Sequence, residues 1–273
     1  MAMNLKTDPS LTPLNQTIRQ SPKYRHISED LIRSLLQREL AAGRTPKEAV
    51  KAAKNKLHQI AGAYFPEKVH YPDWLAELRA AAQTGDQAAL QAACLRVMDH
   101  HASTRERLPI LDDFYAVTLA SVQPVHSVLD VACGLNPLAI PWLPLADEAT
   151  YYACDIYQDM IAFLADFFEL LGLPGLARLC NVLTEVPEEQ VEVALVLKVL
   201  PPLEQVDKAA GLNLLRGLKA EHLLVSFPAH SLGGRHKQMV ENYERHFRRL
   251  IAGEGWQIQR FQFPTELAFL VSK

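Results

Sequence analysis

The feature that most constrains the fold of this chain is the segment 128–138, which reads V-L-D-V-A-C-G-L-N-P-L. Its apolar start predicts a buried strand, Ala132-Cys133-Gly134 predicts a tight turn, and Asn136-Pro137 can begin a helix. Free backbone N–H groups point out of such a turn, so strand, turn and helix start form a cradle for a polar ligand. We therefore expect parallel strands with a binding site at their carboxyl ends.

From residue 125 onward, predicted strands alternate with predicted helices. Strands are expected near 126–131, 150–155, 176–180, 192–198 and 221–227, with helices near 157–171 and 203–219. A helix near 235–251 then leads to two closely spaced strands, 256–262 and 266–271. The alternation predicts an α/β fold with a mostly parallel sheet covered on both faces, and the last pair predicts an antiparallel C-terminal edge.

The first 120 residues carry helical patterns. Ser28 is expected to cap a helix that Gly43 ends, and Thr45-Pro46-Lys47-Glu48 has the pattern of a capping box. Ser103-Thr104-Arg105-Glu106 is a second such pattern, expected to open one helix that runs through Leu119. The chain is therefore predicted to have an all-helical domain at 1–105 and an α/β domain at 106–273, with the boundary inside a helix.

A second polar residue adds to the cradle. Asp155 follows the second predicted strand, where a carboxylate can accept both hydroxyls of a ribose, so a nucleoside cofactor is expected. A dinucleotide fold needs G-x-G-x-x-G, whereas this turn is A-C-G-L-N-P with one glycine, and no G-x-x-x-x-G-K-[ST] segment occurs for ATP phosphates. We favour S-adenosylmethionine (SAM) over NAD, and hence a Rossmann-like SAM-dependent methyltransferase sheet.

The segment after the fourth predicted strand bears on the chemistry. It reads L-K-V-L-P-P-L (197–203) and lacks both an obvious general base and the [DN]-P-P-[YF] clamp that is common in enzymes that methylate exocyclic amines. A ring nitrogen with a free lone pair, such as guanine N7, needs no base because no proton has to leave it. The enzyme must only hold this nucleophile in line with the methyl group.

Composition limits the protein class and suggests a partner. With 273 residues, 49% of them hydrophobic, the chain can bury a large core. The net charge of -3 hides a balance of +5 in residues 1–110, which suggests that the N-terminal half meets a polyanion. No apolar run suits a membrane helix and no signal core is present, so a cytoplasmic protein is expected. Four widely spaced cysteines without a C-x-x-C pair argue against structural zinc and a disulfide framework.

Several segments together resemble one family. They are H-A-S-T-R-E-R-L (101–108), V-L-D-V-A-C-G-L-N-P-L (128–138), C-D-I (154–156), L-K-V-L-P-P-L-E (197–204), S-F-P-A-H-S-L-G-G-R-H-K-Q-M (226–239) and L-H-Q-I-A-G-A-Y (57–64). The chain is similar, from about residue 20 to its end, to the bacterial aminoglycoside-resistance 16S rRNA (guanine(1405)-N7)-methyltransferases, the Arm/Rmt family. The resemblance implies a helical rRNA-docking extension on a SAM domain, and methyl transfer to N7 of the A-site guanine in the 30S subunit.

The resemblance also implies roles for the cofactor residues. Arg107 would pair with the SAM carboxylate, Asp155 would hold the ribose hydroxyls, and Asn181 would reach the adenine, where the family usually has Asp. The complete expected cofactor set is His101, Ser103, Arg107, Asp130, Ala132, Gly134, Asp155, Ile156, Asn181, Val182 and Leu197.

Other residues would serve the RNA. The target guanine must be extruded from stacked rRNA, and the residues expected to position it are Lys198, Ser226, Phe227, Pro228, Arg235 and Met239. Backbone phosphates would be contacted by Arg19, Lys23, Arg33, Arg38, Lys47, Lys51 and Lys54. No metal site is expected, because His100 and His101 lack matching carboxylates.

Two further hypotheses remain open from the sequence. A SAM-dependent small-molecule methyltransferase would explain the α/β half but not the basic helices. A non-catalytic ribosome-binding factor with a decayed SAM site would explain Asn181. In each case a monomer that does not bind a membrane is expected.

Overall fold

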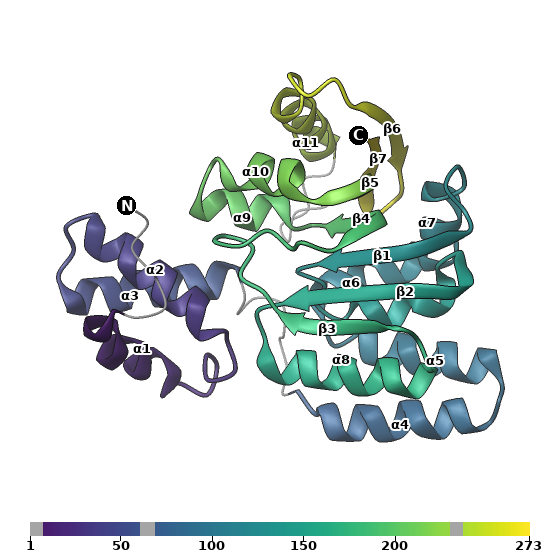
Figure 1. Ribbon diagram of the computed structural model, residues 1–273, viewed down its shortest axis with the longest axis horizontal. Helices are drawn as coiled ribbons and strands as arrows, with labels where there is room; N and C mark the ends of the chain where they lie inside the picture. The colour runs from purple at the N-terminus through teal and green to yellow at the C-terminus, as the bar shows by residue number, and fades with distance from the viewer. Residues whose placement is uncertain (1–7, 61–68, 230–236) are drawn as a thin grey trace.

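The computed structural model describes residues 8–60, 69–229 and 237–273. At its centre is a seven-stranded sheet in the order β3-β2-β1-β4-β5-β7-β6 (Figure 1). The parallel strands are β1 (Val125–Val131), β2 (Leu145–Asp155), β3 (Gly175–Leu179), β4 (Gln190–Leu197) and β5 (Lys219–Pro228). Antiparallel pairing joins β7 (Glu266–Ser272) to β5 and to β6 (Gln257–Gln262). The predicted parallel sheet with an antiparallel C-terminal edge is confirmed.

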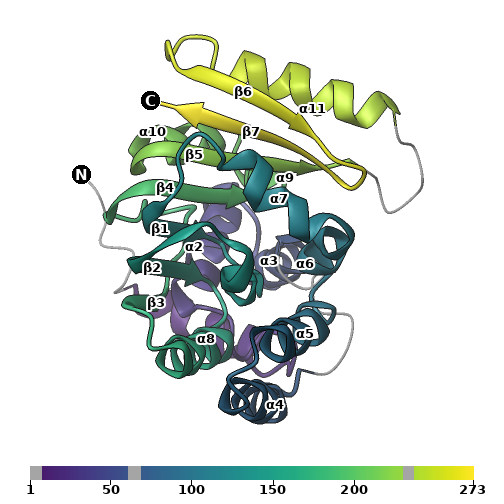
Figure 2. The same cartoon turned by 90° about the vertical axis from the view of Figure 1, so that its right-hand side faces the viewer.

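Each face of the sheet buries its own apolar cluster. Successive side chains of a strand point to opposite faces, so Val128 packs with the helices of one face and Leu129 with those of the other. The first face carries α7 (Leu111–Thr118) and α8 (Gln158–Leu171); the second carries α9 (Leu200–Val206), α10 (Ala210–Gly217) and α11 (Lys237–Leu250). Figure 2 shows α11 beside β6 and β7, on the side away from α7.

Three N-terminal helices form a separate group with an apolar core of their own. They are α1 (Thr12–Arg19), α2 (Glu29–Ala41) and α3 (Pro46–Ile60), preceded by a short 3-10 turn, η2 (Pro9–Leu11). The predicted capping box of α3 is present, since the Glu48 carboxylate accepts from the Thr45 N–H at 3.0 Å and the Thr45 hydroxyl accepts from the Glu48 N–H at 3.4 Å. Ser28 occupies the N-cap position of α2, but its side chain makes no capping bond.

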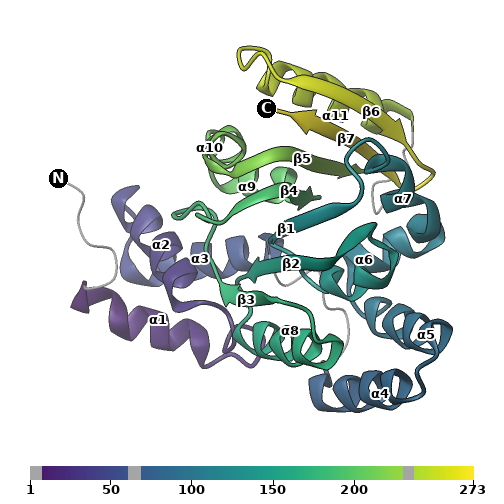
Figure 3. The same cartoon turned by 45° about the vertical axis from the view of Figure 1, so that its right-hand side comes forward.

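The next two helices pack on the sheet rather than on α1–α3. Side chains of α4 (Tyr71–Gln83) and α5 (Gln87–Met98) belong to the same apolar cluster as α8 and β1. Figure 3 shows α4 beyond α8, on the side away from the sheet. The domain boundary placed near residue 105 from the sequence stays a prediction.

The N-terminal group is attached at the carboxyl ends of the parallel strands (Figure 1). Ile27 forms an antiparallel bridge with Tyr157, just after β2. The Ser28 N–H donates to the Ile156 carbonyl at 2.7 Å, and the Gln158 N–H donates to the His26 carbonyl at 2.8 Å. These backbone bonds hold the start of α2 against the loop that follows β2.

Two helices expected to be continuous are broken. The helix expected from Ser103 through Leu119 is α6 (Ala102–Arg107), a 3-10 turn η3 (Leu108–Ile110) and α7, because Pro109 has no N–H to continue the ladder. Ser103 lies inside α6, so the second capping box is wrong.

The helix expected at 203–219 is α9 and α10, separated at Asp207, whose carboxylate accepts from the Ala209 N–H. The segment after the β1 turn is a 3-10 helix, η4 (Asn136–Trp142), with Pro141 inside it. No helix among the described residues has the length and apolarity needed to cross a membrane.

Candidate functional site

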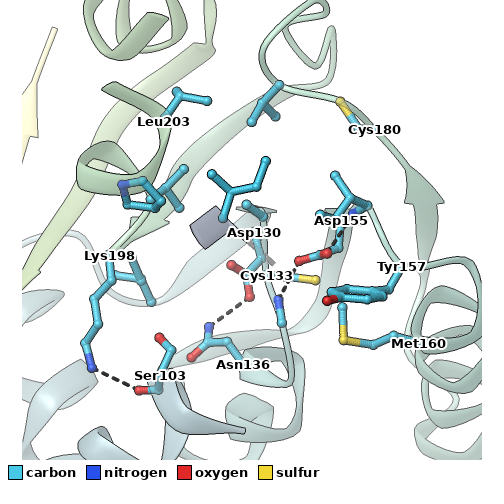
Figure 4. Close-up of a pocket in the computed structure, with 18 of the residues that line it drawn as sticks. Ser103, Asp130, Cys133, Asn136, Asp155, Tyr157, Met160, Cys180, Lys198 and Leu203 are labelled. Carbon is cyan, nitrogen blue, oxygen red and sulfur yellow. Dashed lines mark hydrogen bonds between the residues drawn. The ribbon is translucent and has the colours of Figure 1, made fainter. Parts of the chain in front are cut away.

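A pocket of about 920 Å³, counted out to its open mouth, lies at the carboxyl ends of β1, β2, β3 and β4 (Figure 4). Its wall includes all eleven residues of the expected cofactor set, and also Lys198. Residues from the start of α6 to the end of β4 thus converge, although His101 and Leu197 are 96 positions apart in the sequence.

The turn after β1 is built on Gly134. This residue has a left-handed φ of +54°, and a Cβ there would stand 2.6 Å from Cε1 of His101. The Gly134 N–H donates to Asp155 Oδ2 at 2.9 Å, and the Ile156 N–H donates to Asp155 Oδ1 at 2.6 Å. The turn therefore needs glycine for its conformation and for the space that the His101 ring fills.

Asp130 lies beneath this turn and is almost completely buried. Its Oδ2 accepts from Asn136 Nδ2 and from the Tyr151 hydroxyl, both at 2.8 Å, while Oδ1 receives no hydrogen bond from the described residues (Figure 4 shows the Asn136 bond). Burial raises the pKa of Asp130 to about 7. Buried polar atoms are nearly always paired, so an orphaned carboxylate oxygen on a pocket wall fits a polar ligand.

A buried ion network adjoins the pocket. Glu266, at the start of β7, lies 2.9 Å from the Arg107 guanidinium and 3.1 Å from Lys198 Nζ. Burial alone would raise the pKa of Glu266, but the two cations hold it below its ordinary value. Arg107 also donates to Asn136 Oδ1 at 2.6 Å, which connects the network to Asp130.

Lys198 extends this network to helix α6. Its ammonium donates to the Ser103 carbonyl at 2.9 Å and to Glu106 Oε2 at 2.8 Å (Figure 4 shows the Ser103 bond). Lys198 has φ +62° and Ala132 has φ +49°, so the chain is left-handed just after two neighbouring strands. Such strain in residues other than glycine concentrates at functional sites.

His101 faces the same turn from α6. Burial, and then the charge of Lys198, lowers the pKa of His101 to about 3. The imidazole is therefore neutral at physiological pH and serves as a packed ring against Gly134.

Of the residues expected to position the target base, Lys198 lies on this wall and the others that the structure describes do not. Ser226, Phe227 and Pro228 do not line the pocket. The Phe227 side chain is fully buried in the core of the second face, stacked on Tyr243. Met239 is half-buried on α11 and also lies off the pocket wall, while Arg235 falls outside the described residues.

The expected phosphate contacts divide by their surroundings. Lys47 and Lys51 are exposed on α3, and Lys54 is half-buried. Lys23 Nζ lies 2.8 Å from His58 Nδ1, so this lysine already has a neighbour within the N-terminal group.

The three arginines of the expected set each lie beside a carboxylate of this chain. Arg33 pairs with Glu29 at 2.8 Å and also donates to the Asp8 carbonyl, and its side chain is only 12% exposed. Arg38 pairs with Asp207, just after α9, at 2.9 Å, and Arg19 lies 3.6 Å from Glu29. Of these seven residues, Lys47 and Lys51 are exposed and make no hydrogen bond or ion pair with the described part of the chain.

Sequence reasoning missed several residues of the site. Leu31 of α2 and Ile60 of α3 line the pocket, and Glu266 joins its buried ions. Leu31 and Ile60 follow an ordinary apolar helix pattern. Glu266 follows Pro264-Thr265 with no chemical motif around it, so no local signal could have identified these three residues.

Comparison with known proteins agrees with this geometry. A model of the family "Ribosomal RNA methyltransferase (FmrO)" matches residues 20–270. A 16S rRNA (guanine(1405)-N(7))-methyltransferase of Frankia casuarinae is 38% identical over 95% of this chain and 93% of its own, and one from Serratia marcescens is 35% identical over 94% and 96%.

Solved structures give the same relationship. The 16S rRNA methyltransferase RmtF in complex with S-adenosyl-L-homocysteine superposes with a TM-score of 0.81 at 29% identity, covering 98% of this chain and 99% of that one. The 16S rRNA methylase RmtB gives a TM-score of 0.77 at 31% identity, with both chains covered completely. The chain therefore belongs to the ribosomal RNA methyltransferase (FmrO) family.

Proposed function

We propose that this protein transfers the methyl group of SAM to N7 of guanine 1405 in the 16S rRNA of the 30S subunit, and thereby makes its host tolerant of aminoglycosides. One observation carries the proposal: all eleven expected cofactor residues meet in one pocket, beside a buried cationic network. The 16S rRNA guanine-1405 relatives match over almost the whole chain, including the helical group.

The pocket residues fit SAM. The orphaned Asp130 oxygen and the bare Gly134 turn suit the polar aminoacyl part, and Leu31, Val182 and Leu203 suit a purine face. Arg107, fixed by Glu266 and Asn136, would hold the donor carboxylate, and Asp155 would orient the ribose hydroxyls with its remaining lone pairs.

When bound, SAM supplies an electrophilic methyl group. Guanine N7 attacks with its own lone pair, so the protein has no proton to remove and needs no general base. Its work is to orient the two reactants and to exclude water, which suffices for a large rate effect. Lys198, at the pocket edge and tied to Ser103 and Glu106, would stand where the base enters.

Docking would depend on the N-terminal helices. Lys47 and Lys51 lie on the same helix one turn apart, so they can meet neighbouring phosphates without reading bases. The assembled shape of the subunit would then supply specificity. We further propose that the protein acts as a monomer in the cytoplasm, where it meets 30S subunits.

The direct test uses purified 30S subunits, tritiated SAM and mapping of the modified nucleotide. Label at guanine 1405, together with gentamicin and kanamycin tolerance in expressing cells, supports the proposal. Label in small metabolites and none in rRNA would instead favour a small-molecule enzyme. Binding of 30S without any uptake of SAM would favour a non-catalytic factor.

Variants separate the two proposed parts. Arg107→Ala and Asp155→Ala should lose SAM binding and retain 30S binding, because both lie on the pocket wall. The double variant Lys47→Glu/Lys51→Glu should do the reverse. Lys219→Glu is the matched control, since this exposed lysine begins β5 at the end of the sheet opposite the pocket. If both groups of variants lose the same property, the division is wrong.

A further inference from the structure

One side chain of the pocket is held by the N-terminal helices rather than by the sheet. Asn181 follows β3 and lies beside Asp155, because the Cys180 N–H donates to the Asp155 carbonyl at 3.0 Å. Its amide nitrogen donates to Asp30 Oδ2 and to Ser34 Oγ, both at 3.3 Å and both on α2. The cofactor wall is thus tied to a helix 147 or more positions away.

Three neighbours of Asn181 agree on the orientation of its amide. A carboxylate only accepts hydrogen bonds, so the Asp30 side chain must face the NH₂ group. The Ser34 hydroxyl donates to the Leu31 carbonyl at 2.9 Å, which leaves its lone pairs for the same NH₂. On the other side, the Leu183 N–H donates to Asn181 Oδ1 at 3.3 Å. The carbonyl oxygen is therefore the group that the amide can offer to a ligand.

The surroundings of Asn181 suit the base of a nucleoside. Asn181 lines the same pocket as Asp155, the residue proposed to hold the ribose, and apolar Val182, Leu183 and Leu31 line it too. A purine ring needs apolar faces and, for an exocyclic amine, one acceptor at its edge. A 6-oxo purine would present an oxygen to the same acceptor, and the two lone pairs would repel each other.

We infer that Asp30 is a specificity-determining positioning residue, which acts through Asn181 to fix a hydrogen-bond acceptor for the exocyclic amine of the cofactor's purine. This inference rests on the proposed SAM site. It assigns part of cofactor recognition to helix α2, which belongs to the N-terminal helical group that the proposed function uses for rRNA docking. Thr184 strengthens the arrangement, since its hydroxyl lies 3.1 Å from the same Asp30 oxygen.

The test compares two ligands within each variant. S-adenosylhomocysteine carries the amine, and S-inosylhomocysteine carries a carbonyl oxygen in its place. Isothermal titration of the full-length protein should show the adenosyl ligand bound at least about tenfold more tightly, the worth of one hydrogen bond. In Asp30→Asn the neighbour can both donate and accept, so the Asn181 amide can turn, and the preference should fall to within about threefold.

Two further variants make the result specific. Glu29→Gln removes the same charge one residue away, where the side chain pairs with Arg33, and should keep the full preference. The exchange Asp30→Asn/Asn181→Asp places a carboxylate on the pocket wall, with an amide behind it, and should restore the preference lost in Asp30→Asn. If a variant is partly unfolded, its affinities for the two ligands fall by the same factor and their ratio stays unchanged, so the ratio reports on the amide and not on folding.

The outcomes distinguish this inference from the proposed function. An unchanged preference in Asp30→Asn, or equal weakening of both ligands, overturns the role of Asp30 while SAM binding and rRNA methylation stand. A wild-type protein that binds both ligands equally well also overturns it. A wild-type protein that binds neither ligand overturns the SAM site itself, and the proposed function with it.

Discussion

Substitution of Gly134 by alanine tests how the cofactor turn is built. At φ +54° an alanine pays about 1–2 kcal/mol for the left-handed conformation. Its Cβ would also stand 2.6 Å from Cε1 and 2.9 Å from Nε2 of the His101 ring, closer than real Cβ atoms approach. The ring is buried and cannot swing into solvent, so overpacking adds about 1–3 kcal/mol. We expect Gly134→Ala to lower the free energy of unfolding by about 2–5 kcal/mol.

Gly172→Ala is the matched control for the backbone part. Gly172 follows α8 with φ +62°, and a Cβ there would meet no atom within 4 Å. Its substitution should therefore cost only about 1–2 kcal/mol. The difference between the two variants measures the contact with His101.

The assay is urea unfolding of four proteins that form a cycle: wild type, Gly134→Ala, His101→Ala and the double variant. Removal of the ring should reduce the cost of the alanine to its backbone part, which gives a coupling energy of about 1–3 kcal/mol. The reasoning is refuted if Gly134→Ala costs no more than Gly172→Ala, or costs the same with and without the His101 ring.

Three further predictions concern charged groups. Because burial holds the pKa of His101 near 3, below its ordinary 6.5, the unfolded chain takes up this proton first. The contribution of neutral His101 to the free energy of unfolding is therefore fully present above pH 6.5 and falls as the pH drops, by about 2–3 kcal/mol at pH 4.5. Urea unfolding at pH 6.5 and at pH 4.5 measures this fall in the free energy of unfolding. His101→Gln should lack the part that comes from His101, and an equal fall in the variant would show that His101 is not its cause. Glu266→Gln leaves two buried cations without their carboxylate and should cost about 3–5 kcal/mol in thermal unfolding, whereas Glu106→Gln, at a 38% exposed side chain, should cost under about 1 kcal/mol. Equal costs would disprove the central role of Glu266. Lys47→Glu/Lys51→Glu should reduce the slope of log affinity for 30S against log salt by at least about 1.4, measured by filter binding across KCl concentrations. An unchanged slope would mean that these lysines do not contact phosphate.

The sequence predicted the structure best where the structure depends on residues that are close together in the chain. The order of strands and helices from residue 125, the Gly134 turn and the Thr45 capping box follow from apolar periodicity, backbone freedom and a short polar pattern. The Gly134 turn and Asp155 follow from the local pattern, and the rest of the eleven cofactor residues came from the family resemblance. The structure brings them to one pocket because they lie at the start of α6 or within it, or at the carboxyl ends of neighbouring strands and in the loops that follow.

Predictions failed where distant contacts or single backbone defects decide the outcome. One proline divides the helix after residue 102, although the apolar spacing continues across it. Phe227 lies one residue before the end of β5, but the pleat turns its ring into the core of the second face, where it stacks on Tyr243. Asp30 lies 151 positions from its partner Asn181, and Glu266 lies 159 positions from its partner Arg107. No periodicity in the sequence predicts contacts between residues so far apart.

The order of strands at the sheet edge has a consequence for synthesis. β6 leaves the ribosome before β7, yet β7 lies between β5 and β6. β6 therefore has no strand to pair with until β7 has been synthesised and has inserted between β5 and β6. Glu266 begins β7, so the same insertion delivers the anion that pairs with Arg107 and Lys198. Before β7 has been added to the sheet, Arg107 lacks its buried carboxylate and Lys198 has Glu106 as its carboxylate partner, so the capacity to methylate arises only once β7 is in place.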